Sequence, residues 1–278
     1  MCIFLGIMLK RAIRSLAHRL GYEIHRKRAT SVEPFVRKDP LAEHAQRAIS
    51  IVRGSTMLSE ARLTTLYYQA AFCEQRGIPG SFVECGVWKG GAVGVMALAN
   101  LAHGRLRRQL HLFDAFQEIC EPDPSVDGRR VVEDVWHRMG SEVRLTGALR
   151  PLKGVYDGLG GPGTLAENRR LLEQTIGYDP AFIRYHEGWF QETVPRDASA
   201  IDQIAVLRLD GDLYHSTRIC LEHLYPKVVT GGFVVVDDYG YFQGCTNAVD
   251  EYVETHNLRA FLHPADHVMK SHAYWVKT

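Results

Sequence analysis

The sequence lacks any apolar run long enough to cross a membrane. Its longest apolar stretch, residues 1–9, is far short of the roughly 20 residues that a spanning helix needs. A secretory signal peptide carries its positive charge before the apolar stretch, whereas Lys10 and Arg11 follow it here. We therefore expect a cytoplasmic protein.

Several patterns of cysteine, histidine and glycine are also missing. None of the six cysteines forms a C-x-x-C pair, and a chain of 278 residues is too large to need disulfide staples, so we expect reduced thiols. No set of His and Cys residues has zinc-site spacing. The G-x-G-x-x-G fingerprint is absent, which disfavours an NAD-dependent dehydrogenase.

A strong net charge is missing as well. The formal charge is +1, which argues against a nucleic-acid partner. Apolar residues make up 46% of the chain and charged residues 23%, as in ordinary globular proteins. The balance conceals an asymmetry, because residues 1–38 carry a net charge of +7 and the remaining 240 residues carry −6.

The basic arm has the pattern of an amphipathic helix. Apolar residues recur at helical spacing from Leu9 to Leu20, and basic residues lie on the opposite side. Such a helix can lie on an anionic membrane surface or a partner, or it can pack on its own domain with its charges in water. We predict an arm and linker over 1–40 and one domain over 41–278, with any peripheral membrane contact made by residues 9–28.

In the body, short apolar runs alternate with helical stretches. This alternation, with strands apolar on both faces, predicts an α/β fold built on a doubly wound, mostly parallel, seven-stranded sheet. Residues 117–163 are rich in Gly, Pro and charge, and we expect an insertion over one edge of the sheet. The expected strands cover 81–85, 110–113, 182–186, 204–209, 233–236, 258–262 and 273–276. The expected helices cover 41–75, with a break near 54–55, and 92–103, 165–176, 216–225 and 246–256.

A glycine-rich loop follows the first expected strand. Gly86 permits a tight turn, and Gly90 and Gly91 would let a ligand approach the backbone. The second strand ends in Asp114, where an acid suits the two hydroxyls of a ribose. Each feature alone could be an ordinary glycine turn or a helix cap. In this order they indicate an adenosine site, over which Trp189 could stack, although a core tryptophan is an equal alternative.

Four carboxylates, those of Asp210, Asp212, Asp237 and Asp238, follow two further strands. Because like charges repel, they would raise one another's pKa unless a cation lay between them. Carboxylate oxygens suit a hard ion such as Mg²⁺. Alternatively, some of these acids are loop caps, and only one or two face the ligand crevice. Two histidines near this edge, His186 and His215, are interpreted as structural.

Five motifs follow one another between residues 54 and 252. They are V-E-C-G-V-W-K-G-G at 83–91, G-W-F-Q-E-T-V-P at 188–195, L-R-L-D-G-D-L-Y-H-S-T at 207–217, L-Y-P-K at 224–227 and G-G-F-V-V-V-D-D-Y-G at 231–240. Together they resemble the macrocin O-methyltransferase family of metal-dependent sugar methyltransferases. The resemblance implies an enzyme that uses S-adenosylmethionine and Mg²⁺ to methylate a sugar hydroxyl of a glycosylated metabolite, nucleotide sugar or surface glycan.

The resemblance also implies roles for individual residues. The metal would be held by Asp210, Asp237 and Asp238, and Asp212 would be the general base. The methyl donor would be bound by Glu84, Gly86 and Asp114.

This chain departs from the family pattern where the acceptor is bound. It has Asp114-Ala115-Phe116 in place of D-S-F, so a serine contact to the cofactor is lost, and residues 117–124 differ from the usual G-L-P-x-P. Two alternatives stay open: a catechol-type or other small-molecule O-methyltransferase, and a non-catalytic cofactor-binding protein at a membrane. A homo-oligomer is also expected.

Overall fold

A computed structural model describes residues 40–258, 260, 262–264 and 272–278. The predicted basic helix and linker lie outside the described residues. Within the described part of the chain, no helix is both long and apolar enough to cross a membrane.

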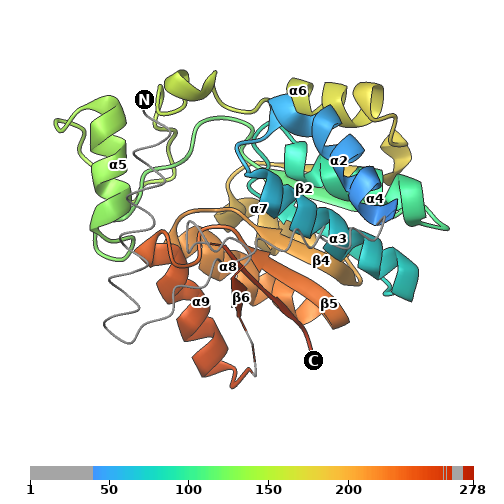
Figure 1. The fold of residues 1–278 in the computed structure, drawn as a ribbon. Helices are drawn as coiled ribbons and strands as arrows, with labels where there is room; N and C mark the ends of the chain where they lie inside the picture. Colours follow the sequence, from blue (N-terminus) through green and yellow to red (C-terminus); the bar gives the residue numbers. More distant parts are fainter. Residues whose placement is uncertain (1–39, 259, 261, 265–271) are drawn as a thin grey trace, which may run out of the picture. The chain divides into compact units, whose positions relative to one another are not determined.

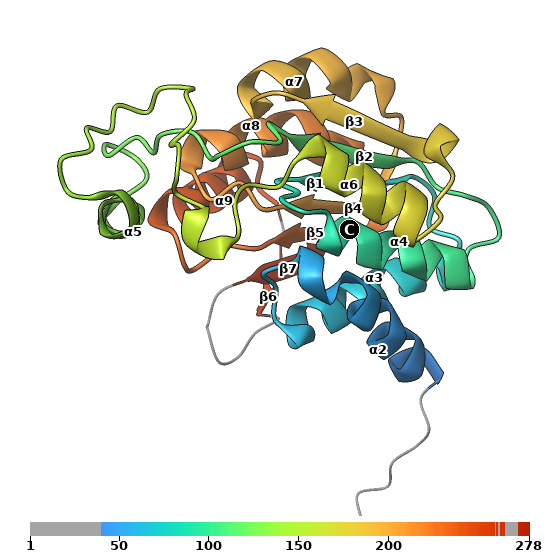
Figure 2. The same ribbon diagram turned by 90° about the horizontal axis from the view of Figure 1, so that it is seen from above.

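A seven-stranded sheet forms the centre of the fold, in the order β3-β2-β1-β4-β5-β7-β6 (Figures 1 and 2). The strands are β1 (Ser81–Cys85), β2 (Leu110–Asp114), β3 (Ile183–Glu187), β4 (Ile204–Leu209), β5 (Val228–Val236), β6 (His263–Pro264) and β7 (Ala273–Val276). Strands β1 to β5 are parallel, and β7 runs antiparallel between β5 and β6. The predicted seven-stranded, mostly parallel sheet is confirmed. The strand order reverses between β1 and β4, which is where such sheets bind ligands.

Helices cover both faces of the sheet. Figure 2 shows α7, α8 and α9 on one side and α2, α3, α4 and α6 on the other. Their bounds are α2 (Pro40–Val52), α3 (Glu60–Arg76), α4 (Gly91–His103), α6 (Leu165–Arg169), α7 (Phe190–Asp197), α8 (Tyr214–Leu224) and α9 (Gln243–Thr255). A separate buried apolar cluster fills each interface. Side chains of consecutive strand residues point to opposite faces of the sheet. Phe82 of β1 therefore belongs to the first cluster and Val83 to the second.

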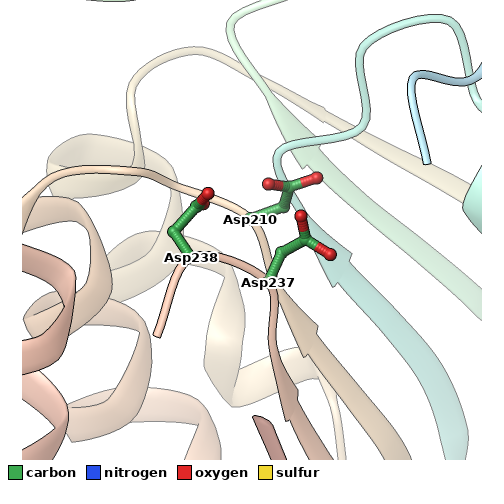
Figure 3. Close-up of side chains that lie close together, drawn as sticks. All are labelled: Asp210, Asp237 and Asp238. Atoms are coloured by element: carbon green, nitrogen blue, oxygen red, sulfur yellow. The ribbon is translucent and has the colours of Figure 1, made fainter. Parts of the chain in front are cut away.

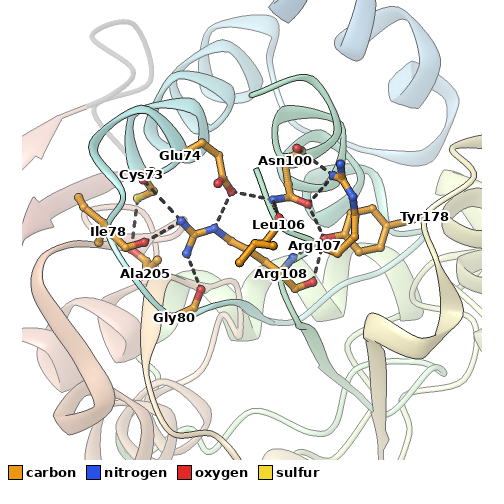
Figure 4. Close-up of polar contacts among 10 residues, drawn as sticks. All are labelled: Cys73, Glu74, Ile78, Gly80, Asn100, Leu106, Arg107, Arg108, Tyr178 and Ala205. Atoms are coloured by element: carbon orange, nitrogen blue, oxygen red, sulfur yellow. Dashed lines mark hydrogen bonds and ion pairs between the residues drawn. The ribbon is translucent and has the colours of Figure 1, made fainter. Parts of the chain in front are cut away.

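A polar network fixes the end of the sheet opposite to the ligand crevice (Figure 4). Arg108, just before β2, donates to Glu74 on α3 at 2.5 Å and to the carbonyl oxygen of Gly80 at 2.5 Å. Asn100 on α4 donates to the same Glu74 carboxylate at 2.9 Å and accepts from the Tyr178 hydroxyl at 2.9 Å. These contacts tie α3, α4 and the starts of two strands together.

Several expected elements differ from the structure. The expected helix over 165–176 becomes a π-helix after Arg169, with Ile176 N donating to Leu171 O, five residues back. The expected strand over 258–262 is wrong as an element: the strand is only His263–Pro264, and Leu258 packs on the second apolar cluster. Helix α7 was not expected, because it is short and contains Pro195.

The insertion between β2 and α6 carries a helix of its own, α5 (Arg129–Met139). It was expected over a sheet edge. Instead it packs on the loops that follow three strands, through a cluster that includes Trp189, Leu213 and Phe242. The insertion therefore borders the crevice at the carboxyl ends of the strands, and in both ribbon views α5 stands apart from the sheet.

Candidate active site

Three aspartates meet where β4 and β5 end (Figure 3). Asp210 follows the last residue of β4, and Asp237 and Asp238 follow the last residue of β5. One carboxylate oxygen from each lies within 4.8 Å of the others. The adjacent parallel strands place these side chains together, as the sequence predicted.

A buried arginine organises this cluster. Arg208, the penultimate residue of β4, is 1% exposed. Its Nη1 donates to Glu84 at 2.5 Å and to Asp210 at 2.9 Å, and its Nη2 donates to Asp237 Oδ1 at 2.9 Å. Sequence reasoning missed Arg208, although a charged residue inside the apolar run V-L-R-L signals a buried charged partner.

Asp237 has further cationic or donor neighbours. Arg62 of α3 donates to its Oδ2 at 2.8 Å, and His272 Nδ1 lies 2.8 Å from its Oδ1. Burial acts to raise the pKa of Asp237, but Arg208, His272 and Arg62 outweigh it and hold that pKa below its usual range. Arg62 and His272 were not predicted, because they come from distant parts of the chain.

Asp238 lies in the opposite environment. Burial first, and then Asp212 and the other carboxylates, raise the pKa of Asp238 well above its usual range. Its Oδ2 is buried and has no hydrogen-bond partner among the described residues. A buried carboxylate oxygen without a donor is costly unless a ligand or ion completes it.

Asp212 stands beside this cluster in a strained backbone. Its φ is +57°, in the left-handed region that is uncommon for residues other than glycine. Its carboxyl group shares a hydrogen bond with Asp238, and burial with the nearby carboxylates raises the pKa of Asp212 to about 7. A carboxyl group with such a pKa can take up a proton near neutrality.

A cavity joins two of these acids, Asp210 and Asp212, to the end of β2 and to the insertion. Its walls include Gly86, Asp114, Tyr156, Trp189, Asp210 and Asp212. A second cavity, which contains Asp237 and Asp238, shares Trp88, Asp210 and Asp212 with the first. Of the predicted donor-binding residues, Gly86, Asp114 and Trp189 thus line one cavity, whereas Glu84 borders the second and is 1% exposed against Arg208.

Asp114 holds the loop that follows β1. Its Oδ2 accepts from the backbone N–H groups of Val87 at 2.6 Å and Trp88 at 3.1 Å, and its Oδ1 accepts from Phe116 N at 2.6 Å. Burial raises the pKa of Asp114 to about 6, although these N–H groups oppose the rise. The carboxylate therefore shapes the loop as well as lining the cavity.

The loop glycines are required by the chain itself. A Cβ at Gly86, whose φ is +87°, would overlap the backbone carbonyl of Asp210. An added Cβ at Gly90 would meet Asn168, and one at Gly91 would meet the backbone of Ser55, although Gly91 also lines the second cavity, so ligand approach at these two glycines stays a prediction. Close packing within the fold explains these glycines.

The two histidines near this edge lie outside the acidic cluster. His186 is held between His111, at 3.0 Å, and Asp197, at 2.9 Å, as its structural interpretation predicts. His215 is exposed and lies 3.5 Å from Asp123 of the insertion.

The donor set fits a hard divalent cation. Three carboxylates converge, one buried oxygen has no donor, and oxygen ligands are those that Mg²⁺ prefers. Oδ1 of Asp237 already faces Arg208 and His272, whereas Oδ2 accepts from Arg62 and has a second lone pair that can bind one more group.

Comparisons with known proteins identify the family of this chain. The family model described as macrocin-O-methyltransferase (TylF) matches residues 14–144 and 170–277. A demethyldecarbamoylnovobiocin O-methyltransferase of Streptomyces niveus is 35% identical over 228 residues, which are 80% of this chain and 76% of that protein. An 8-demethyl-8-(2,3-dimethoxy-α-L-rhamnosyl)-tetracenomycin-C 4′-O-methyltransferase of Streptomyces olivaceus is 34% identical over 197 residues, covering 71% and 67%.

A solved structure is also similar. The O-methyltransferase NovP has a TM-score of 0.63 and 29% identity, and the match covers 86% of this chain and 99% of that one. The family model spans more than half of the chain, and the matched residues include the acids and the loop described above. This chain therefore belongs to the macrocin O-methyltransferase family of S-adenosylmethionine-dependent O-methyltransferases.

Proposed function

We propose that this enzyme methylates a sugar hydroxyl with Mg²⁺ held by Asp210, Asp237 and Asp238 and with Asp212 as the general base. The observation that carries the proposal is the position of Asp212. It adjoins the three-carboxylate cluster and lines the same cavity as Asp114 and Trp189. The candidate base and one candidate ion ligand, Asp210, thus share a cavity with the candidate methyl-donor residues, and the other two ligands line the adjoining cavity.

The residues divide the chemical work. A sugar hydroxyl has a pKa far above 7, and a divalent cation bound at the cluster supplies Lewis acidity toward it. Asp212 accepts the hydroxyl proton as the sugar oxygen attacks the methyl carbon of the sulfonium; the new C–O bond forms while the C–S bond breaks, and S-adenosylhomocysteine leaves as a neutral thioether. Asp114 and Trp189 orient the methyl donor, because methyl transfer needs in-line approach and most of the rate should come from positioning.

We propose a glycosylated small molecule as the acceptor. The relatives carry names of novobiocin-type, rhamnosyl-tetracenomycin and mycinamicin O-methyltransferases, so their acceptors bear sugars. The insertion borders the cavity in this chain, and it differs from the family pattern at residues 117–124, so the acceptor need not be one of theirs. We further propose a cytoplasmic enzyme, with any membrane contact made through residues 9–28.

A paired screen tests the proposal. The purified chain, S-adenosylmethionine and Mg²⁺ would be incubated with a panel of glycosides and, separately, with catechols, and products read as a mass gain of one methyl group. Methylation of a glycoside that EDTA abolishes supports the proposal. Methylation of catechols alone would favour the catechol-type alternative, and activity that survives EDTA would remove the metal from the mechanism.

A further inference from the structure

A tyrosine that no motif singled out reaches the cavity from the insertion. Tyr156 lines the same cavity as Asp114, Asp210 and Asp212, yet it lies outside every motif shared with the family. Its side chain is half-buried, and its ring packs beside the small apolar cluster that contains Val135 and Leu152.

The backbone around Tyr156 is firmly held. The buried carboxylate of Glu118 accepts from Gly154 N at 3.1 Å and from Tyr156 N at 3.2 Å. Leu152 N donates to Ile119 O at 2.9 Å, so the two ends of the insertion lie side by side. Glu118 thus fixes the backbone position from which the Tyr156 side chain extends.

The hydroxyl of Tyr156 is a free donor in an acidic setting. Among the described residues it has no hydrogen-bond partner. Burial first, and then Asp212, Asp114 and Asp210, raise the pKa of Tyr156 well above its usual range. The phenol therefore keeps its proton and can donate a hydrogen bond, whereas it cannot serve as a base.

We propose that Tyr156 donates a hydrogen bond to an oxygen of the ribose of bound S-adenosylmethionine. The phenol extends into the cavity where Asp114, predicted to bind the ribose, and Asp212, predicted to act at the methyl group, both lie. The ribose links the adenine to the sulfonium, so it occupies the space between those two acids. This inference rests on the proposed function, because it takes the cavity to be the methyl-donor site.

Calorimetric titration with S-adenosylhomocysteine tests it without any acceptor. Tyr156→Phe should weaken binding about two- to tenfold, the usual worth of one neutral hydrogen bond. Its thermal midpoint without ligand should not change, because the hydroxyl has no partner in the fold to lose. Tyr185→Phe is the matched control, since the Tyr185 hydroxyl bonds to Glu173 at 3.2 Å and does not line the cavity.

A second ligand locates the contact. 5′-Methylthioadenosine keeps the ribose but lacks the amino-acid tail, and it should lose affinity by the same factor. If only S-adenosylhomocysteine is affected, the ribose assignment is overturned. Equal affinity of wild type and Tyr156→Phe for both ligands would overturn the proposal as a whole. Failure of the wild type to bind S-adenosylhomocysteine would instead count against the proposed function.

Discussion

Asp237 and Asp238 are consecutive residues in opposite electrostatic environments. Asp237 faces two arginines and a histidine, whereas Asp238 faces carboxylates and has an oxygen with no donor. Asp237 therefore stabilises the fold, whereas Asp238 lowers the stability of the metal-free protein. This contrast separates two residues that the family motif treats as equivalent metal ligands.

Unfolding of the metal-free variants should reveal that contrast. Asp237→Asn removes a charge that compensates buried Arg208, and it should lower the free energy of unfolding by about 3 kcal/mol. Asp238→Asn relieves repulsion between carboxylates and should leave stability unchanged or raise it. Both variants should lose Mg²⁺ binding. The measurements are urea unfolding in EDTA and calorimetric Mg²⁺ titration, and equal destabilisation by the two substitutions would contradict this account.

Asp212 should behave differently from the three predicted ligands. Asp212→Asn keeps the size and hydrogen bonding of the side chain but cannot accept a proton. It should retain binding of both Mg²⁺ and S-adenosylhomocysteine while kcat falls by about 10²–10⁴, the usual share of general-base catalysis. Loss of Mg²⁺ binding in this variant would make Asp212 a ligand. Full activity would require another base, for which exposed His215 is the nearest candidate in sequence.

At the scale of elements, the loop after β1 is held from two sides. Asp114 accepts its N–H groups, and Asn168 of α6 donates to Trp88 O at 2.7 Å. The Trp88 ring nitrogen also donates to Gly161 O at 3.2 Å, which joins this loop to the end of the insertion. The position of the loop thus depends on contacts that span 26 to 80 positions of sequence.

Two substitutions distinguish direct binding by Asp114 from loop support. Asn168→Ala removes the hydrogen bonds from the side chain to Trp88 O and Thr164 O but leaves the contacts of Asp114 in place, and it should weaken S-adenosylhomocysteine binding modestly through the loop. Asp114→Ala disturbs the same loop and also removes a charged partner for the ribose, so it should weaken binding by at least a further tenfold. Calorimetry on both variants measures the difference. If the two lose affinity equally, Asp114 acts only through the loop.

The sequence predicted those features of the site that follow from a parallel arrangement of the strands. Parallel strands end at one edge, so Asp210, Asp237 and Asp238 could be placed together from two apolar runs that each end in acids. The contacts of Arg62, Tyr156 and the loop glycines could not be predicted, because they depend on which distant segments pack there. Helix α7 and the π-helical segment were not predicted for a local reason. Pro195 interrupts the helical pattern of α7, and the π-helical segment has a different hydrogen-bond period.

At the scale of the whole molecule, the basic arm and the acidic body should be separable. The described residues from Pro40 onward contain both apolar clusters and every predicted site residue. Removal of residues 1–39 should therefore leave methyl transfer in solution intact. If the arm binds membranes, full-length protein should float with anionic vesicles at about 1 kcal/mol per basic residue near the surface, and the truncated protein should not.

Equal partitioning of the two proteins would favour an arm that packs on its own domain. Vesicles made only of neutral lipid are the control, because electrostatic attraction requires anionic headgroups. Sedimentation of the same two proteins would test the expected homo-oligomer and show whether the arm contributes to it.

A buried histidine pair makes the stability of the whole fold depend on pH. His111 of β2 is 5% exposed, and its Nδ1 lies 3.0 Å from Nε2 of His186 on β3. Burial first, and then His186 and Arg184, lower the pKa of His111 to about 4, from 6.5 in an unfolded chain. Because a charged imidazolium is disfavoured there, the folded protein binds this proton less readily than the unfolded chain does.

The sign of the effect follows from that difference. Above about pH 6.5 neither state binds the proton, and protonation of His111 does not change the free energy of unfolding. Between about pH 6.5 and 4 the unfolded chain binds it and the folded protein does not, so stability falls as pH falls, by about 3 kcal/mol over the whole interval.

His111→Gln cannot be protonated, so its unfolding free energy should fall less between pH 7 and pH 4.5 than that of the wild type. Urea unfolding at both pH values measures this, with His137→Gln on the exposed part of α5 as the matched control. An unchanged pH dependence in His111→Gln would mean that His111 becomes protonated in the folded protein as readily as in the unfolded chain.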